Sequence, residues 1–449
     1  MSNKKINNNL KDGLLKKTNL PWFEPLDLAQ KISANYKENW VFLYSGLSNQ
    51  QKSSRSFIAV YENQKYRGNN FDEFEKIVAK GDDEMWFGGL NYEALDIFDK
   101  NKQSLNPQHY LFNQISYPSI FFSQFDLVFE FLHDKKNVVV HARDDEKISS
   151  ILSFQNKPYQ GLISVAKINS NFSDSSYKKS IEELKKMIAN GDFYQANLTR
   201  KFFGEFDKKL SNRDNFNLFT DLVTISPANY SCFMKFDDLT IISSSPELFL
   251  RSKNNIIYSK PIKGTIKRGK TQHEDNINRL YLKNSLKEKA ENLMIVDLMR
   301  NDFARFCAPK SVRVNNLFKI STYKTIFHLS SQIKGKIAKN YSLFDVVRNC
   351  FPAGSMTGAP KIKVIETLRN YEKIQRGIYS GALGYFWGKK AINLSVVIRT
   401  LIIKNDKFEF QVGGGITFDS DAESELQETY SKANAILQIL KLPKKFRHN

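Results

Sequence analysis

Four glutamates have a spacing that could hold a cation. Glu288 and Glu291 are three residues apart in KEKAENLMIVD, and Glu425 and Glu428 repeat this spacing in SELQETYSKA. Residues three apart share one face of a helix, although acids near a helix start are also common because they favour the helix dipole. If the two helices meet, four carboxylates converge, and oxygen ligands select a hard cation such as Mg²⁺. The spacing alone leaves a solvated surface and a metal site as alternatives.

A lysine lies in a glycine-containing segment, PIKGTIKRG at 261–269. Glycine followed by a small polar residue predicts a tight turn at Gly264. Lys263 is then either part of a basic surface turn or an amine that is held ready to bind or attack a substrate. The residues around it in the folded chain decide between these two interpretations.

Three other polar residues lie in apolar surroundings. Arg399 falls within a predicted strand, INLSVVIRTLII, where a lone arginine needs either a structural carboxylate or the carboxylate of a substrate. Taken alone, His328 in TIFHLSSQI is typical of a core histidine. Glu247 in SSSPELFL is by itself typical of a surface acid at a strand edge.

Glycine-rich segments offer a further way to hold an anion. Gly413, Gly414 and Gly415 follow a predicted strand, so their N–H groups could approach an anion closely. The pattern is neither a Walker loop nor a GxGxxG fingerprint, which argues against nucleotide binding. FPAGSMTGAPKIK at 351–363 is a second glycine-rich turn, and it leads into a helix predicted to start near Pro360.

Periodicity predicts the elements that carry these residues. Helices are expected at about 177–188, from Arg279 to Arg300 and from about Ala422 onward. The expected apolar face of the long middle helix is Leu282, Leu286, Ala290, Leu293 and Val296, and that of the last helix is Leu426, Tyr430, Ala433, Leu437 and Leu440. Predicted strands cover 40–46, 56–62, 136–142, 193–206, 231–236, 240–250, 255–262, 381–387, 392–403 and 408–418. Long strands with grouped helices favour an α+β fold over a doubly wound parallel sheet.

Bulk properties exclude several classes of protein. The 449 residues suggest a polar tail at 1–18, a domain at 19–165 and a second at 170–445. A formal charge of +20 allows a nucleic-acid-binding protein, but the lysines are spread over the whole chain and no RNA-binding or zinc-finger pattern is present. Three scattered cysteines predict neither disulfides nor zinc. With no signal peptide or membrane span in the sequence, we expect a cytoplasmic location.

Ten segments in order resemble the chorismate-utilising enzyme family, from about Ser175 to Leu440. They are GDFYQANLTR, SSSPELFL, PIKGTIKRG, AENLMIVDLMRND, HLSSQIKG, FPAGSMTGAPK, RGIYSGALGYF, VVIRT, VGGGI and ESELQETYSKA. The resemblance implies large antiparallel sheets packed as a sandwich, with helices on the outside. The first half of the chain resembles the variable N-terminal domain of the members that work with an amidotransferase.

The resemblance also implies a role for each candidate residue. Glu291 and Glu428 would bind Mg²⁺, and Glu288 and Glu425 would support it. Glu247 matches the general acid, and His328 matches a histidine beside the reacting ring. The positions matching those that bind chorismate are Gly264, Thr265, Lys361, Tyr379, Arg399, Gly413, Gly414 and Gly415.

Two positions indicate the type of reaction within this family. Members that add water at C2 have a lysine base where this chain has Gln195, and glutamine is not a base. Members that aminate C2, the anthranilate synthases, usually read PIAGT, whereas those that aminate C4 commonly read PIKGT, as here with Lys263. The resemblance therefore implies a lysine nucleophile and amination of chorismate at C4, with C2 amination as the alternative.

The ammonia for such a reaction needs a source. A glutaminase needs a nucleophilic cysteine on a glycine-bracketed elbow, and Cys232, Cys307 and Cys350 all lack that setting. We therefore expect a separate glutamine amidotransferase subunit as partner, and expect neither nucleic acid nor a membrane to be one.

Overall fold

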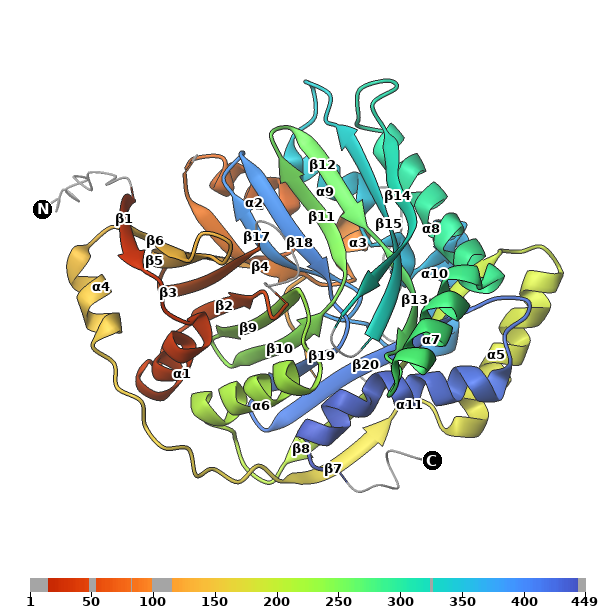
Figure 1. Cartoon of the computed structure of the whole chain (residues 1–449), viewed down its shortest axis with the longest axis horizontal. Helices are drawn as coiled ribbons and strands as arrows, with labels where there is room; N and C mark the ends of the chain where they lie inside the picture. Colours follow the sequence, from red (N-terminus) through yellow and green to blue (C-terminus); the bar gives the residue numbers. More distant parts are fainter. Residues whose placement is uncertain (1–14, 48–53, 82, 99–114, 324–325, 443–449) are drawn as a thin grey trace, which may run out of the picture.

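The computed structural model describes residues 15–47, 54–81, 83–98, 115–323 and 326–442 (Figure 1). Its strands are joined by antiparallel pairing into one hydrogen-bonded network. The strands are β1 (Lys16–Pro21), β2 (Trp40–Tyr44), β3 (Arg55–Gly68), β4 (Met85–Leu90), β5 (Ile120–Leu132), β6 (Asn137–Ala142), β7 (Val165–Ser170), β8 (Gln195–Phe206), β9 (Tyr230–Phe236), β10 (Leu239–Ser245), β11 (Leu248–Lys253), β12 (Ile256–Lys260), β13 (Ile262–Lys267), β14 (Arg313–Thr322), β15 (Ile326–Lys336), β16 (Gly358–Ala359), β17 (Ala382–Trp387), β18 (Ala391–Val396), β19 (Thr400–Lys404) and β20 (Lys407–Ile416).

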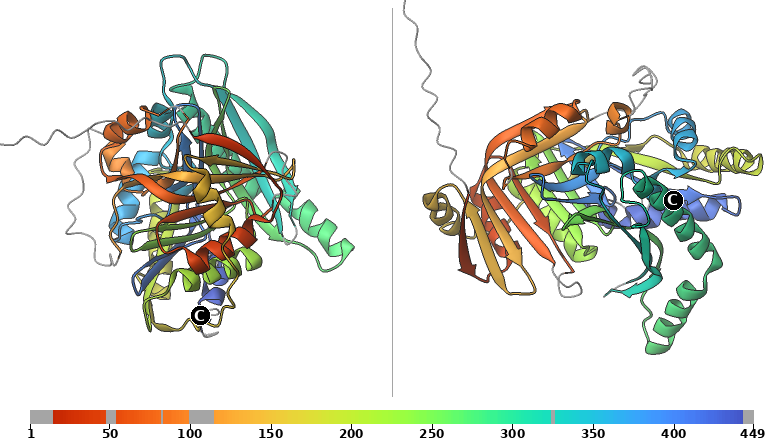
Figure 2. Two further views of the ribbon diagram at one scale, coloured as in Figure 1. Left: turned by 90° about the vertical axis from the view of Figure 1, so that its left-hand side faces the viewer. Right: turned by 90° about the horizontal axis from the view of Figure 1, so that it is seen from above.

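The helices lie against this sheet network. They are α1 (Pro25–Asn35), α2 (Phe71–Val78), α3 (Ala94–Phe98), α4 (Asp145–Leu152), α5 (Asp174–Ala189), α6 (Asn212–Ile225), α7 (Gln272–Asn284), α8 (Leu286–Ala304), α9 (Leu343–Cys350), α10 (Lys361–Glu372) and α11 (Ala422–Ile439). Most of them pack on the strands, whereas α7 stands out from the rest of the chain in both views of Figure 2. No helix in the described part of the chain combines the length and the apolar character needed to cross a membrane.

The network divides at the long strand β5. One arm runs through β3, β2, β9, β10, β19, β20 and β8, and the other runs through β4, β17, β18, β11, β12 and β15. Strands from the first third of the chain therefore pair directly with strands from the last. The boundary predicted between residues 165 and 170 does not separate two sheets.

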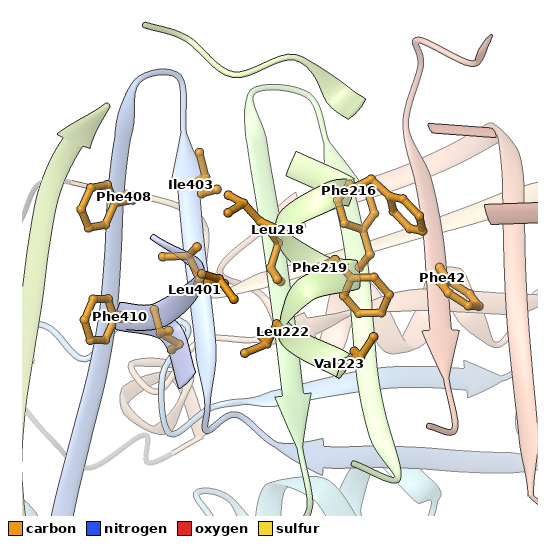
Figure 3. Close-up of a cluster of buried hydrophobic side chains, with 14 of the residues drawn as sticks. Phe42, Phe216, Leu218, Phe219, Leu222, Val223, Leu401, Ile403, Phe408 and Phe410 are labelled. Carbon is orange, nitrogen blue, oxygen red and sulfur yellow. The ribbon is translucent and has the colours of Figure 1, made fainter. Parts of the chain in front are cut away.

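Three buried clusters hold the arms and helices together. One lies between the arms, with Val41, Phe57, Met234 and Leu383 among its members. Another packs helices on the outer face of the first arm, where Leu218 and Leu222 of α6 face Leu401 and Ile403 of β19 (Figure 3). Phe216 and Phe219 of the same helix face Phe42 of β2. A third packs α2, α8, α9 and α10 on the second arm. The predicted α+β sandwich with outer helices is confirmed.

The helices of the site differ in how well periodicity predicted them. The predicted apolar face of α11 is confirmed, because all five residues are buried. The predicted helix from Arg279 to Arg300 is in fact two helices, since Ser285 leaves the helical conformation and its Oγ accepts a hydrogen bond from the N–H of Glu288. In α8 the predicted face is confirmed at Val296 but wrong at Leu286, which is 82% exposed, and at Leu293, and the buried side chains include Ile295 and Met299.

Two further predictions are corrected. Residues 1–14 lie outside the described residues, but Lys16 to Thr18, predicted as tail, belong to β1 and pair with β6. The predicted strand at 392–403 is interrupted, because β18 ends at Val396 and β19 begins at Thr400. Arg399 lies in this break with a left-handed φ of 52°.

The joint between β17 and β18 gives a test of the fold. A Cβ on Gly384 would lie 1.9 Å from the carbonyl oxygen of Asn393, whereas one on Gly191 would meet nothing within 4 Å, although its φ of +84° is strained. We expect Gly384→Ala to lower the free energy of unfolding by about 3 kcal/mol or more, and Gly191→Ala by only about 1 kcal/mol. Urea unfolding measures both values, and equal losses would contradict the close packing of these strands.

Candidate active site

Two helix starts bring the four glutamates together. α8 begins after Ser285, and α11 begins after Asp421, whose carboxylate accepts from the N–H of Ser424 at 2.8 Å. The two starts face each other, because the Lys287 ammonium on α8 lies 4.0 Å from the Glu425 carboxylate on α11. Burial raises the pKa of Glu288, and the negative charges of Glu291 and Glu428 add to this effect. The sequence left this convergence open, and the tertiary structure provides it.

Lysines lie among these carboxylates. Lys263 Nζ is 3.8 Å from Glu291 Oε2, and both side chains are about nine-tenths buried, with 14% and 13% exposed. Lys432 Nζ is 2.6 Å from Glu428 Oε1 and donates to the Gly413 carbonyl at 2.7 Å. Burial alone would raise the pKa of Glu428, but the charge and hydrogen bond of Lys432, together with the charges of Lys263 and Lys287, outweigh it and the pKa is lowered. Each carboxylate pair thus has a nearby ammonium that offsets part of its charge.

Lys263 projects from a bulge, which corrects the predicted turn. β13 pairs with β15, but the register shifts between Ile262 and Thr265, so Lys263 and Gly264 form the irregularity. Gly264 has a φ of +82°, and a Cβ there would lie 2.9 Å from Glu288 Oε2. Glycine is needed at this position both for the backbone conformation and for the space it leaves.

The three glycines of β20 also make room for charged groups. The strand predicted at 408–418 contains them, and the structure confirms it, because they lie within β20 and pair with Asn197, Leu198 and Thr199 of β8. A Cβ on Gly414 would lie 2.7 Å from Glu425 Oε2, and one on Gly415 would lie 2.1 Å from Gln195 Nε2 and 3.3 Å from Lys263 Nζ. The side chains of Gln195 and Lys263 therefore both end close to Gly415, in the space that its missing Cβ leaves. Gln195 Oε1 is buried and has no hydrogen-bond partner within the protein.

Glu247 is a buried carboxyl between β10 and β11. Burial raises its pKa to about 7, although the Ser355 hydroxyl, the Lys263 charge and the main chain of Ile262 act in the opposite direction. Tyr379 is buried close enough that the Glu247 charge helps to raise the pKa of its phenol, where burial is the main cause. A carboxyl with this pKa is protonated at and below neutral pH, as a general acid requires.

His328 and Arg399 are close enough for the charge of one to act on the other. His328 Nδ1 is hydrogen-bonded to Thr265 Oγ1 at 2.7 Å. Burial lowers the pKa of His328 to about 3, and the charges of Arg399 and Lys260 contribute, so the imidazole is neutral. Burial also lowers the pKa of Arg399, which forms no ion pair with any described residue. Its guanidinium is therefore available to an anion.

Lys361 is the one predicted substrate ligand that is engaged elsewhere. Its ammonium donates to Asp302 at 2.8 Å and to the Cys350 carbonyl at 3.2 Å, which fixes the start of α10. Sequence reasoning missed Ser355, Lys432 and Lys287 as neighbours of the site. Only Lys432 left a signal, because it follows Glu428 at the i,i+4 spacing of a helical ion pair.

A search with protein-family models finds one match over this site and its scaffold. The model described as chorismate binding enzyme covers residues 22–438. The chain belongs to the chorismate binding enzyme family. The match spans both halves of the chain, in agreement with the shared sheet network.

Curated relatives with two different names match this chain. The chain is 41% identical over 274 residues to aminodeoxychorismate synthase, chloroplastic, of Arabidopsis thaliana, which covers 60% of this chain and 29% of that protein. It is 30% identical over 368 residues to anthranilate synthase component 1 of Lactococcus lactis. This alignment covers 78% of this chain and 79% of that protein. The chain thus spans less than a third of the length of its Arabidopsis relative.

The fold is shared with a solved structure, anthranilate synthase component I from Streptococcus pneumoniae. The TM-score is 0.73 at 26% identity, over 85% of this chain and 92% of that one. A structural likeness at this identity supports the family fold, and the site residues of this chain have to decide the reaction.

The raised pKa of Glu247 leads to a pH-dependent difference in stability. The folded state holds a proton up to about pH 7, whereas the unfolded carboxyl releases it near 4.5, so stability falls as pH rises through this window. Between pH 4.5 and pH 8, we expect the free energy of unfolding of Glu247→Gln to rise by about 3 kcal/mol relative to that of the unsubstituted protein. Denaturant unfolding at both pH values measures this gain. Glu182→Gln, at an exposed position on α5, should show no such trend, and a flat difference for Glu247→Gln would contradict its burial.

Proposed function

We propose that this protein aminates chorismate at C4, forming 4-amino-4-deoxychorismate and water from chorismate and ammonia. The observation that carries the proposal is the position of Lys263. Its amine lies in a bulge beside Glu291, meets Gln195 above Gly415, and is close enough to Glu247 to lower the pKa of that acid. The Lys263 amine could act as a nucleophile beside the protonated acid Glu247. Gln195 is not a base and could not activate a water, so the arrangement favours a lysine nucleophile.

The proposed reaction has two displacements. In the first, the neutral Lys263 amine attacks C2, the two conjugated double bonds of the ring both shift towards C4, and the C4–O bond breaks while Glu247 transfers its proton to the departing hydroxyl, which leaves as water. In the second, ammonia forms a bond to C4, both double bonds return to their original positions, and the C2–N bond to Lys263 breaks. The proton released by the ammonium of the product returns Glu247 to its acid form. Lys263 must be neutral to attack, so its ammonium passes its proton to solvent or a neighbouring carboxylate beforehand.

Other side chains of the site would bind and orient the substrate. The Arg399 guanidinium and the N–H groups along β20 are proposed to hold the carboxylates of chorismate, which carries two. The neutral His328, fixed by Thr265, would lie beside the ring without adding charge. Tyr379 would close the buried side near Glu247.

The carboxylate donors fit a hard cation. In the described part of the chain no three acidic, His or Cys side chains already form a metal-binding cluster. However, Mg²⁺ commonly takes only one or two protein carboxylates and leaves positions for substrate oxygens. Glu288, Glu291 and Glu428 also lie close enough for their negative charges to repel, and a bound cation would relieve this repulsion. We propose Glu291 and Glu428 as its ligands, with Glu288 and Glu425 in support, and a bound Mg²⁺ would neutralise and orient a substrate carboxylate.

A glutaminase partner is part of the proposal. Burial raises the pKa of Cys232 and of Cys307 to about 12, and that of Cys350 well above its ordinary value. These thiols are poor nucleophiles at neutral pH. We therefore propose that a separate glutamine amidotransferase delivers the ammonia.

Amination at C2, which would give anthranilate, is the second candidate function. The relative from Lactococcus lactis and the structure from Streptococcus pneumoniae, both named as anthranilate synthases, favour it. Lys263 argues against it, because direct attack of ammonia on C2 needs no lysine nucleophile at that carbon.

A mass-resolved product assay separates these two reactions. The purified chain is incubated with chorismate, Mg²⁺ and ammonium chloride, and in parallel with glutamine in place of ammonium. We expect the ammonium reaction to give a product that keeps the enolpyruvyl group, and the glutamine reaction to give none. Anthranilate with released pyruvate would overturn the proposal in favour of C2 amination.

The role of Lys263 is tested by a substitution with a matched control. We expect Lys263→Ala to lower kcat for C4 amination about a hundredfold or more, because it removes the attacking amine. Lys267→Ala, an exposed position on the same strand β13, should keep near-normal turnover. Steady-state kinetics with ammonium chloride give both values. Full activity in Lys263→Ala would remove the covalent step.

The Mg²⁺ ligands are tested through binding as well as activity. We expect Mg²⁺ to raise the melting temperature of the protein, and Glu428→Gln to shift the midpoint of this titration to roughly tenfold higher Mg²⁺ or more. Glu423→Gln is the control, because Glu423 is on the same helix but is exposed and pairs with Lys178. Identical Mg²⁺ titrations for the two variants would place the ion elsewhere.

A further inference from the structure

A cavity lies next to the candidate active site and is lined by none of the candidate site residues. It has a volume of about 430 Å³ and opens between β9, β11, β12, β14 and β15. Its lining includes the side chains of Tyr230, Leu248, Ile320 and Tyr323. A volume of this size accommodates a small organic molecule.

Three cations line this cavity without an acidic neighbour. Arg251, Lys260 and Lys319 come from three different strands, and the lining contains no aspartate or glutamate. None of the three forms an ion pair with another described residue, and the Arg251 guanidinium lies over the ring of Tyr258, 5.5 Å from its centre. In a chain where many surface lysines and arginines do pair with acids, these three are held together unpaired.

Their proximity has an electrostatic cost. Burial lowers the pKa of Lys260, and the positive charges of Lys319 and Arg251 lower it further. Like charges that repel in a partly buried place are stabilised by an anion between them. Ser321, Thr322 and Gln332 also line the cavity and add neutral hydrogen-bonding groups, while Leu248 and Ile320 offer apolar surface to a carbon skeleton.

The cavity and the active site are separated by a thin wall. Leu248 directly follows Glu247 in the chain. Ser321 is paired with His328 across β14 and β15, and the Tyr323 ring lies 5.3 Å from the His328 ring. The charge of Lys260 reaches His328 and helps to lower its pKa. An anion in the cavity would offset part of this charge, so its occupancy would be felt in the active site.

We propose that this cavity is a second anion-binding site, distinct from the catalytic pocket, which binds a small dianion through Arg251, Lys260 and Lys319. The ligand chemistry is that of a dicarboxylate or a phosphate group attached to a small, partly apolar skeleton. The proposal goes beyond the amination reaction and does not depend on it, because it concerns a cavity that contains no residue of the reacting site.

The test is a binding titration in an Arg399→Gln background, without Mg²⁺. Arg399→Gln removes the unpaired guanidinium of the catalytic pocket, so anion binding that persists reports on the second cavity. The full chain is titrated by calorimetry with inorganic phosphate in one arm and with phthalate, an unreactive aromatic dicarboxylate, in the other. To this background we add Lys260→Gln, Lys319→Gln or the control Lys336→Gln, which removes an exposed lysine of β15 outside the cavity.

We expect one anion per chain to bind in the Arg399→Gln background. Lys260→Gln and Lys319→Gln should each weaken this binding roughly tenfold, because each removes one of three charges facing the anion. Lys336→Gln should leave the affinity within about twofold, since an exposed and distant charge is screened. Lys319 is exposed, so its substitution should not disturb folding, which circular dichroism checks for every variant.

The two arms identify the class of ligand. Tighter phosphate binding would assign the site to phosphate-bearing ligands, and tighter phthalate binding would assign it to dicarboxylates; either result supports the proposal. It is overturned if neither anion binds in the Arg399→Gln background, or if both bind with an affinity that Lys260→Gln and Lys319→Gln leave unchanged.

Discussion

Close approach of the main chain at three glycines decides where the charged groups of the site can lie. Gly264 leaves room for Glu288, Gly414 for Glu425, and Gly415 for the meeting of Gln195 and Lys263. Side chains at these positions would push the helix starts of α8 and α11 away from the strands β13 and β20. The convergence of acids and amines therefore depends on the absence of three Cβ atoms, one in the bulge of β13 and two in the regular strand β20.

The site brings together charges that would repel each other in isolation. Burial raises the pKa of Glu288, the charges of Glu291 and Glu428 raise it further, and the ammonium groups of Lys263 and Lys432 lie beside these carboxylates. Burial acts on the groups around them in opposite ways. It keeps Glu247 protonated near neutral pH and keeps His328 neutral well below it. Burial is thus the main reason both that Glu247 can donate a proton and that His328 carries no charge.

The sheet network supplies the rigidity that this arrangement needs. The arm ending in β20 and β8 carries the glycines and Gln195, and the arm ending in β15 and β13 carries His328 and Lys263. Buried ion pairs stiffen the first arm, since Arg376 is bonded to Glu372, and Glu372 accepts from Thr199 of β8. Because the two arms join at β5, strands from the first third of the chain help to hold the two halves of the site in place.

The sequence by itself determined the fold class, the face of α11, the family and the types of residue that form the site. These features depend on local periodicity and on motifs whose order along the chain is readable. It also predicted a lysine amine, a candidate acid and two pairs of glutamates at helical spacing. It misjudged the buried face of α8, because burial there is set by the strands and helices that pack on α8 and not by its own apolar spacing.

Only the tertiary structure decided how these groups relate to one another. The predicted turn at Lys263 became a bulge because β13 pairs with the distant strand β15. The strand around Arg399 is broken, and the glycines of β20 serve as space for side chains from α11 and β8. The pKa values of Glu247 and His328, and the unpaired cations beside β12, likewise arise from burial and from charges far away in the chain. Such effects depend on distances in space, and a linear pattern of residues contains no measure of them.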